Sequence, residues 1–428
     1  MKYVLIDMGS SRISIMAVEM TENGEVRVLS EESKKSDEIK YGIVGQASKC
    51  AYTINELTKL LQNSSRLSEI NKVCISLNAK TMKLVSVRIN RSLGFGKTIT
   101  DELLNEMRQE CKAKFNHSEI EVFDIIPHYY ELDGIKTDNP VDERASDLSA
   151  FYNVIVGNID IKEELQRCFD RTLNISTDNF MPLGMEALSA VLLSDDERAE
   201  GCALINFGAT TTTLAIYADG VLQHLLVVPL GGKNITKDIQ ELGMSEANAE
   251  KLKCLKGSAL KRLVDEPVRI QIPSTDEENP PIRIATNFLA TIIEARLSEI
   301  MTPILIAIDK TPFDLNAGIV ITGGGSKLNN IVDFLEEKTD MEVRFGNHSD
   351  WLSDDSQRRF SDPIYAQLIG TAVLLHEHKS KHPENEQSVH KESEKRGANN
   401  QKTKFTDKIK DKISNRFLKL FEDENYLT

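Results

Sequence analysis

Some segments of this chain alternate apolar and polar residues or are short apolar runs, as strands do, and others repeat apolar residues every three or four positions, as helices do. The order of these segments along the chain indicates an α/β protein. Residues 3–7 and 72–77 are short apolar or alternating runs, which are typical of strands. Apolar residues three and four apart predict helices over residues 47–61, 101–115, 161–172, 233–242, 245–253 and 284–300. Pro303 is expected to kink or end the last of these helices. Alternation of strands and helices favours mixed sheets covered by helices.

One strand–turn–strand segment occurs twice. VLIDMGSSRISIMAV (residues 4–18) aligns without a gap on ALINFGATTTTLAIY (residues 203–217). Each copy is an apolar strand, a turn of Gly and small hydroxyl residues, and a second alternating strand. The alignment pairs Asp7 with Asn206, and the two turns begin at equivalent glycines. Two such hairpins predict two related domains that face each other across a cleft.

The pattern changes again near the end of the chain. From about residue 376 to 401, Lys, Glu, His, Ser and Asn prevail, so a flexible linker is expected. Residues 405–421 then predict a short amphipathic helix on this tether. Its apolar residues recur three or four apart, at Phe405, Ile409, Ile413, Phe417, Leu420 and Phe421.

Charge distinguishes this last segment from the rest of the protein. Between residues 404 and 419, six basic residues stand against two acidic ones, a local charge of +4 on a chain of net charge −14. A basic amphipathic helix fits the interface of an anionic bilayer. Docking on a globular partner or on its own domain is the alternative. The overall negative charge argues against nucleic-acid binding, which needs clustered Lys and Arg.

Length and cysteine usage set further bounds. A chain of 428 residues exceeds one core, so two or more domains are expected. The six cysteines are scattered without a CxxC pair, which favours reduced core thiols over a zinc site or disulfides. No secretory signal and no apolar run of about 20 residues is present, so a cytoplasmic protein is expected.

Several motifs together resemble one superfamily. The two hairpins, IVITGGGSKLNNI (residues 319–331) and PIYAQLIGTAVLL (residues 363–375) occur in the order found in the actin and sugar-kinase ATPases. In that superfamily the hairpin turns present backbone N–H groups and hydroxyls to nucleotide phosphates. A carboxylate in each hairpin helps to hold magnesium through water, and glycines let the backbone approach the adenosine.

The resemblance implies ATP and Mg²⁺ as cofactors and assigns the site by position. Asp7 would bind magnesium through water. The first turn would be Asp7, Gly9, Ser10, Ser11 and Arg12, and the second would be Asn206, Gly208, Ala209, Thr210, Thr211 and Thr212. The adenosine would be contacted by Glu250, Lys253, Gly323, Gly324 and Gly325.

Further segments are similar to FtsA, the bacterial actin-like family that ties the division machinery to the membrane. GCALINFG is followed by VLQHLLVVPLGGKNITKDI and AEKLKCLKGSAL in the order and spacing of that family. Pro280, Pro281 and the IEAR of residues 293–296 fall where the family has comparable residues. An insertion of strand–helix–strand type, at about residues 82–158, lies where FtsA carries its own small subdomain in place of one found in actin.

The resemblance implies an actin-like, ribonuclease H-like duplicated fold with two domains and an inserted subdomain. The first domain would comprise residues 1–81, 159–198 and a closing helix at 362–377. The second would comprise residues 199–230 and 286–361. The remaining parts would be the inserted subdomain (82–158), a peptide-binding subdomain (231–285), a disordered linker (378–403) and a membrane-targeting helix (404–424).

Three departures from the superfamily pattern bear on catalysis. Asn206 and Thr213 stand where the family has or often has Asp, and Gly184 stands where a water-orienting side chain is expected. Replacing a carboxylate by an amide removes a charge that would oppose magnesium. Glu186 is two positions away on a predicted helix and points elsewhere. Nucleotide binding with weak or absent hydrolysis is therefore expected, and no catalytic residue is assigned.

By resemblance, the protein polymerises on the cytoplasmic side of the inner membrane at the division septum. Its partners would be the C-terminal peptide of FtsZ, further copies of itself, anionic lipid and other division proteins. Arg283 and Arg296 would contact the acidic FtsZ peptide. The expected membrane contacts are Phe405, Lys408, Ile409, Lys412, Ile413, Arg416, Phe417, Leu420 and Phe421.

Two other functions stay open for this fold. One is a working ATPase or small-molecule kinase, against which the amide at Asn206 counts. The other is the pilus-assembly relative of FtsA, which shares the inserted subdomain. That relative is not expected to end in a helix such as residues 405–421.

Overall fold

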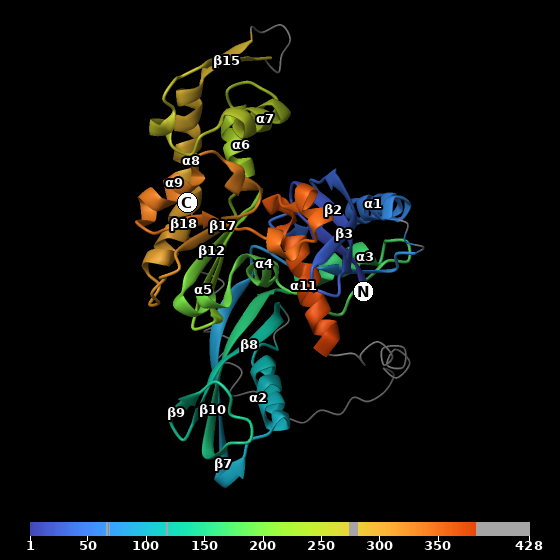
Figure 1. Cartoon of the computed structure of the whole chain (residues 1–428), viewed down its shortest axis with the longest axis vertical. Coiled ribbons are helices and arrows are strands. Elements are labelled where there is room, and N and C mark those ends of the chain that lie inside the picture. The colour runs from blue at the N-terminus through green and yellow to red at the C-terminus, as the bar shows by residue number, and fades with distance from the viewer. Residues whose placement is uncertain (66, 68, 117–118, 274–280, 382–428) are drawn as a thin grey trace. The chain divides into compact units, whose positions relative to one another are not determined.

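The computed structural model describes residues 1–65, 67, 69–116, 119–273 and 281–381. Residues 1–378 form one compact unit, and Figure 1 labels many of its elements. The second unit begins at residue 379 and is described only as far as residue 381. All arguments about the site concern the first unit.

The first repeat forms a five-stranded sheet with the order β11-β6-β1-β2-β3. β1 pairs antiparallel with β2, and β2 with β3, whereas β6 lies parallel to β1 and to β11. These strands are β1 Lys2–Met8, β2 Arg12–Met20, β3 Val26–Lys35, β6 Lys72–Ile75 and β11 Ser176–Thr177.

The second repeat forms a sheet of the same order and strand sense, β18-β17-β12-β13-β14. β12 replaces β1 at the centre, and its neighbours match those of β1 one for one. The duplication read from the sequence is therefore confirmed at the level of the whole sheet. The strands are β12 Cys202–Phe207, β13 Thr212–Ala218, β14 Val221–Val228, β17 Ile319–Thr322 and β18 Val343–Phe345.

The insertion forms a separate antiparallel sheet of order β7-β10-β8-β9, with helix α2 against β7 and β8 (Figure 1). Its elements are β7 Lys83–Thr98, α2 Asp101–Ala113, β8 Ile120–Leu132, β9 Ile135–Thr137 and β10 Arg144–Asn158. Thr100 caps α2, because its side chain accepts a hydrogen bond from the Leu103 amide. Two-stranded sheets are formed by β4 Ile39–Lys40 with β5 Ile43–Val44, and by β15 Arg269–Ile272 with β16 Ile282–Ala285.

Helices connect and cover these sheets. In the first half they are α1 Ala47–Ser65, α3 Asp160–Phe169, α4 Gly184–Leu192, α10 Asp354–Phe360 and α11 Ala366–Lys381. In the second half they are α5 Asp195–Glu200, α6 Gly232–Gln240, α7 Glu246–Lys256, α8 Thr286–Asp309 and α9 Ile331–Thr339. Short 3₁₀ helices occupy Lys261–Leu263, Gly324–Lys327, Ser349–Trp351 and Pro363–Tyr365.

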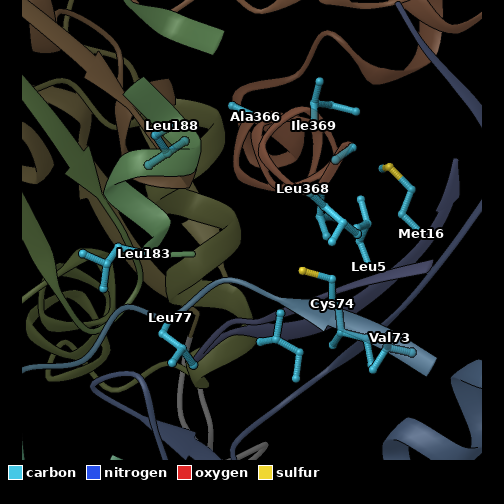
Figure 2. Packing of buried hydrophobic residues seen from close by; sticks show 14 of the residues in the cluster. Leu5, Met16, Val73, Cys74, Leu77, Leu183, Leu188, Ala366, Leu368 and Ile369 are labelled. Atoms are coloured by element: carbon cyan, nitrogen blue, oxygen red, sulfur yellow. The ribbon is translucent and has the colours of Figure 1, made fainter. Parts of the chain in front are cut away.

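Both central sheets are buried on both faces, which explains their nearly continuous apolar runs. On β12, Leu204 packs into the core of the first half, while its neighbour Ile205 packs with the helices of the second half. Figure 2 shows how α11 enters the first core, with Leu368 directed toward Leu5 of β1 and Met16 of β2. Residues of both repeats therefore contribute to the first core, and the second core lies within the second half.

Helix α11 also makes a backbone contact with α4. A Cβ on Gly370 would lie 1.7 Å from the Ala187 carbonyl oxygen, a distance that no side chain can accommodate. This close crossing positions the start of α11, at Gln367, beside the first hairpin.

Three predictions about elements were wrong. Helix α8 starts at Thr286, after Ile284 and Ala285 have joined strand β16, and it continues through Pro303 to Asp309. Buried Ile304 and Ile308 extend its apolar face beyond the proline, and this packing outweighs the lost hydrogen bond. Helix α11 reaches Lys381, so no linker begins at residue 378. The last residues of α11 are polar, but lysine has a favourable helix propensity, so the polar composition does not end this helix.

The other structural expectations have mixed outcomes. All six cysteines are free thiols and five are buried, but Cys254 is exposed, so the expectation of core thiols was wrong for this residue. Within the described ranges, no helix is long and apolar enough to cross a membrane. The proposed linker after residue 381 and the helix at 404–424 lie outside the described residues.

A pair of carboxyl groups joins the insertion to the first half. Glu186 on α4 caps its own helix, where Oε2 accepts from the Leu183 amide at 3.2 Å, and its carboxyl group hydrogen-bonds Asp124 on β8. Asp124 Oδ1 also accepts a hydrogen bond from Arg108 Nη2 of α2 at 3.3 Å. Burial, followed by the charge of Asp124, raises the pKa of Glu186 to about 8. Glu186 is therefore protonated at neutral pH and donates to Asp124.

This arrangement predicts how stability depends on pH. Because the folded-state pKa of Glu186 exceeds its usual 4.5, its contribution is complete below pH 4.5 and is lost as pH rises toward about 8. Glu186→Gln keeps the hydrogen bonds of the protonated acid, so its stability relative to the parent should increase with pH, by up to about 1.4 kcal/mol per pH unit. Urea unfolding at pH 5, 6.5 and 8 measures the difference. The exposed Glu200→Gln serves as the control, and equal pH slopes for Glu186→Gln and the parent would contradict the assignment.

Candidate functional site

The two hairpin turns have the same backbone geometry. Asp7 pairs with Ser14 across the first hairpin, and Asn206 pairs with Thr213 at the equivalent place in the second. A Cβ on Gly9 would lie 2.7 Å from the Arg12 carbonyl oxygen, and one on Gly208 would lie 2.9 Å from the Thr211 carbonyl oxygen. Both turns therefore require glycine for the same reason: the carbonyl oxygen three residues later leaves no room for a Cβ.

The segment after the third strand supports each turn. The Ser36 amide donates to Ser11 O at 3.0 Å in the first half. In the second half, the Gly232 and Lys233 amides donate to Gly208 O and Ala209 O at 2.9 and 2.8 Å. Two donors at the start of helix α6 are thus used to hold the second turn.

Asp7 occupies a polar cluster at the end of β1. Gln367 Nε2 of α11 lies 3.5 Å from Asp7 Oδ1 and 2.9 Å from Ser76 Oγ, while Asn78 Nδ2 donates to Gln367 Oε1 at 3.0 Å. Burial raises the pKa of Asp7 to about 6, and the positive charge of Arg12 opposes this rise. Asp7 is thus contacted by the neutral amide of Gln367, which Asn78 holds in turn.

Arg12 places a cation at the first turn. Its guanidinium carbon lies 5.4 Å from the centroid of the Tyr365 ring. Nη2 is buried and has no hydrogen-bond partner among the described residues. A buried unpaired donor is costly, so this atom is a suitable donor for a bound phosphate oxygen.

The glycine run packs mainly on the second hairpin. Gly323 has φ +87°, and a Cβ there would lie 2.4 Å from Asn206 Oδ1. A Cβ on Gly325 would lie 2.5 Å from the Phe207 ring. Gly324 is exposed and has only Ile364 nearby, at 3.9 Å. Two of the three predicted adenosine glycines thus have a packing role, and Gly324 has the open surroundings of a ligand contact.

Glu250 and Lys253 are joined to each other on α7. Lys253 Nζ lies 2.7 Å from Glu250 Oε2, 2.8 Å from Thr236 Oγ1 and 2.9 Å from Gly232 O. Thr236 also hydrogen-bonds Glu250. These contacts connect α7 to the start of α6, beside the second turn.

The threonines of the second turn differ in their surroundings. Thr212 is fully buried, and its hydroxyl donates to Leu230 O at 2.9 Å. Thr213 is buried as well, beside Asn206 in the register of the hairpin. Thr210 Oγ1 accepts a hydrogen bond from the Tyr41 amide of the other half at 3.2 Å. Thr210 and Thr211 are the partly exposed hydroxyl residues of this turn.

Asn78 fills the space next to Gly184. A Cβ on Gly184 would lie 2.0 Å from Asn78 Nδ2, so a side chain at this position would require Asn78 to move. Glu186 is directed to Leu183 and Asp124, as described above. Neither residue on α4 presents a group that could orient water at the turns.

Four residues beside the two turns were not found from the sequence. Lys233 Nζ donates from the second half to Ser10 O of the first turn at 2.6 Å. Gln367, Asn78 and Tyr41 contribute the contacts given above. Lys233 and Gln367 lie inside the motifs GGKNITKDI and PIYAQLIG, where a polar residue next to small or apolar ones was the available signal.

The two arginines expected to bind a peptide have different surroundings. Arg296 on α8 is bound by Asp238 at 2.5 Å and by Glu299 at 2.5 Å. Arg283 on β16 is exposed, and the strand register places it on the same face as the exposed Arg269 of β15. The other face of these strands, with Ile272 and Ile284, packs into the second core. Pro280 lies outside the described residues.

The remaining assignments involve metal and membrane. Among the residues that the structure describes, no group of three or more His, Cys, Asp or Glu side chains could hold a metal ion directly. Asp7 is the one carboxylate among the residues assigned to the two turns. The nine predicted membrane contacts, from Phe405 to Phe421, lie outside the described residues.

Comparison with known proteins agrees with this geometry. The family model for the cell division protein FtsA matches residues 203–370. FtsA of Borreliella burgdorferi is 26% identical over 383 residues, covering 87% of this chain and 90% of the relative. FtsA of Escherichia coli K12 is 25% identical over 408 residues, covering 90% of this chain and 92% of the relative.

Solved structures show the fold. A PilM–PilN type IV pilus biogenesis complex matches with a TM-score of 0.61 at 15% identity, covering 87% of this chain and 98% of that one. MreB 5 of Spiroplasma citri bound to AMPPNP matches with a TM-score of 0.53 at 12% identity, covering 89% and 97%. The sequence and structural comparisons agree: this chain is related to the cell division protein FtsA along most of its length and has an actin-like fold.

Proposed function

We propose that this chain is an actin-like, nucleotide-binding cell-division protein that polymerises on the cytoplasmic face of the membrane. It anchors the FtsZ ring there through its C-terminal amphipathic helix. The relationship to FtsA supports the division role, and the fold it shares with a nucleotide-bound MreB supports nucleotide binding.

The observation that carries nucleotide binding is the pair of equivalent glycine turns on opposite halves. In each turn, a backbone carbonyl oxygen of the same turn lies so close to the glycine that a Cβ would collide with it. Arg12 offers a buried donor that has no acceptor among the described residues, and Ser10, Ser11, Thr210 and Thr211 supply hydroxyls. This set of donors fits a polyphosphate, and ATP is its proposed ligand.

The same cleft lacks the groups that hydrolysis needs. Magnesium, when bound, would compensate phosphate charge, but only Asp7 of the two equivalent hairpin positions is a carboxylate. Asn206 faces Gly323 with an amide, and Gly184, which has no side chain to orient water, lies against the side chain of Asn78. We therefore assign the nucleotide a conformational role: it holds the two halves together, and this closed form assembles into filaments.

The first prediction from this function concerns turnover. The chain should bind ATP with magnesium yet release phosphate far more slowly than about 1 per second, the lower end of ordinary enzyme rates. Asn206→Asp restores a carboxylate of the same shape beside Gly323, so it should tighten magnesium-dependent binding. Titration of a fluorescent ATP analogue and a phosphate-release assay measure both effects. Asn116→Asp, which makes the same charge change on the exposed insertion, should behave as the parent. Turnover of about 1 per second or faster in the parent would contradict the proposed role.

The second prediction concerns the FtsZ peptide. The exposed face of β15–β16 carries Arg269 and Arg283 without an ion pair among the described residues, which suits an acidic peptide. Arg283→Glu should weaken binding of a labelled FtsZ tail peptide about tenfold or more without changing the melting temperature. Arg296→Glu should instead lower the melting temperature, because Asp238 and Glu299 lose their partner.

Charge reversal at the exposed Arg358 of α10 is the matched control. Unchanged peptide affinity in Arg283→Glu would place the peptide elsewhere. Equal loss of affinity in Arg358→Glu would show a nonspecific charge effect.

The membrane anchor rests on sequence alone. Each large apolar side chain buried contributes about 1.5–3 kcal/mol, less when insertion is shallow, and each lysine near an anionic surface adds about 1 kcal/mol. Ordering the helix consumes much of this gain, so one copy binds weakly. Many copies on a filament bind strongly through their effective concentration. Anchoring should therefore depend on assembly.

The third prediction tests this anchor. Phe417→Glu with Phe421→Glu removes two apolar contacts and adds two charges that anionic lipid repels, so the protein should leave anionic liposomes in co-sedimentation. Nucleotide binding should be unchanged. Ser414→Glu with Asn415→Glu adds the same charge without removing an apolar side chain, so it should weaken binding less. A Phe417/Phe421 variant that sediments as fully as the parent would show that this helix is not the anchor.

A further inference from the structure

Lys233 is the cation that connects the two halves of the cleft. It lies in the first turn of α6, on the second half, while its Nζ is 2.6 Å from the carbonyl oxygen of Ser10 in the first turn. The backbone amide of the same residue donates to Ala209 O in the second turn. One residue therefore contacts both hairpin turns.

The ammonium group of Lys233 forms no ion pair within 4 Å in the part of the chain that the structure describes. The exposed Asp37 is close enough to interact electrostatically with Lys233, but its direct ion pair is with Lys49. An ammonium has three donors, and the Ser10 carbonyl uses one of them. A partly buried cation held by a neutral carbonyl, without a carboxylate, is electrostatically suited to an anion.

Arg12 strengthens this argument from the other side of the same turn. Its buried Nη2 has no acceptor among the described residues, and it also forms no ion pair there. The first turn is thus flanked by two cations, one from each half. The carboxyl group of the hairpin, Asp7, carries at most one negative charge, so it offsets at most one of these two positive charges.

We propose that Lys233 is a phosphate ligand that the second half supplies to the first hairpin turn, so that a bound polyphosphate is shared between the halves. This inference rests on the proposed nucleotide binding and assigns it a residue. The positive charge of Lys233 compensates phosphate at a site where Asn206 replaces a carboxylate and magnesium is less firmly held. Removal of the ammonium weakens both the phosphate contact and the closure of the cleft.

Substitutions on α6 test the proposal. Lys233→Met removes the charge at nearly constant length, and Lys233→Arg retains it. The exposed Lys237, one turn further along the same helix, provides Lys237→Met as the matched control. The affinities of ATP, ADP and adenosine are measured by isothermal titration, and folding is checked by thermal unfolding.

Lys233→Met should bind ATP and ADP about tenfold or more weakly, the effect expected for loss of a charge-assisted hydrogen bond. Lys233→Arg should recover much of this loss, and Lys237→Met should match the parent. Adenosine, which has no phosphate, should bind all four proteins equally. Parent-like ATP affinity in a folded Lys233→Met would overturn the assignment of Lys233 and leave the proposed function intact. A parent protein that binds no nucleotide would instead overturn the proposed function.

A measurement on the unaltered protein covers the case in which Lys233→Met does not fold. Acetic anhydride acetylates accessible lysines, and mass spectrometry quantifies Lys233 relative to Lys237 in the same sample. Saturating ATP should protect Lys233 several-fold more than Lys237. Equal acetylation of Lys233 with and without ATP would contradict the proposal.

Discussion

Close approach of backbone to backbone at the two hairpin turns is the constraint on which the cleft depends. Gly9 and Gly208 each face a carbonyl oxygen three residues ahead, at a distance that excludes a Cβ. The turns can be this tight because β1 and β12 are central strands, fixed by neighbours on both sides and buried on both faces. Because these strands are densely packed, the turn atoms that would contact phosphate are held in fixed positions.

The duplication, the order of the motifs and the position of the insertion could all be predicted from the sequence. Hydrophobic periodicity and the repeated turn are local signals, and each half forms its sheet from its own segments. The end of α8 could not be predicted, because the packing of Ile304 and Ile308 against distant residues overrides the local effect of Pro303. The end of α11 was also missed. The polar composition after residue 376 indicates that these residues are exposed to solvent, but exposed residues can still be helical.

The site was predictable where it lies on the repeat and not where it lies between the repeats. The turn residues are contiguous and were assigned by alignment. Gln367 reaches Asp7, and Lys233 reaches Ser10, across hundreds of residues of sequence. Such contacts depend on the crossing of α11 over α4 at Gly370 and on the start of α6 at the second turn. A single sequence carries no direct record of these distances.

The two equivalent hairpin positions differ in charge. One hairpin has the carboxyl group of Asp7, and the other has the amide of Asn206, whose oxygen packs against Gly323. Cations come from both halves, Arg12 from the first hairpin and Lys233 from α6. A site in which protein cations compensate phosphate favours holding the nucleotide in its ground state, because these charges need not increase their interaction in the transition state. Holding the nucleotide, and with it the closed arrangement of the two halves, is what an assembly switch requires.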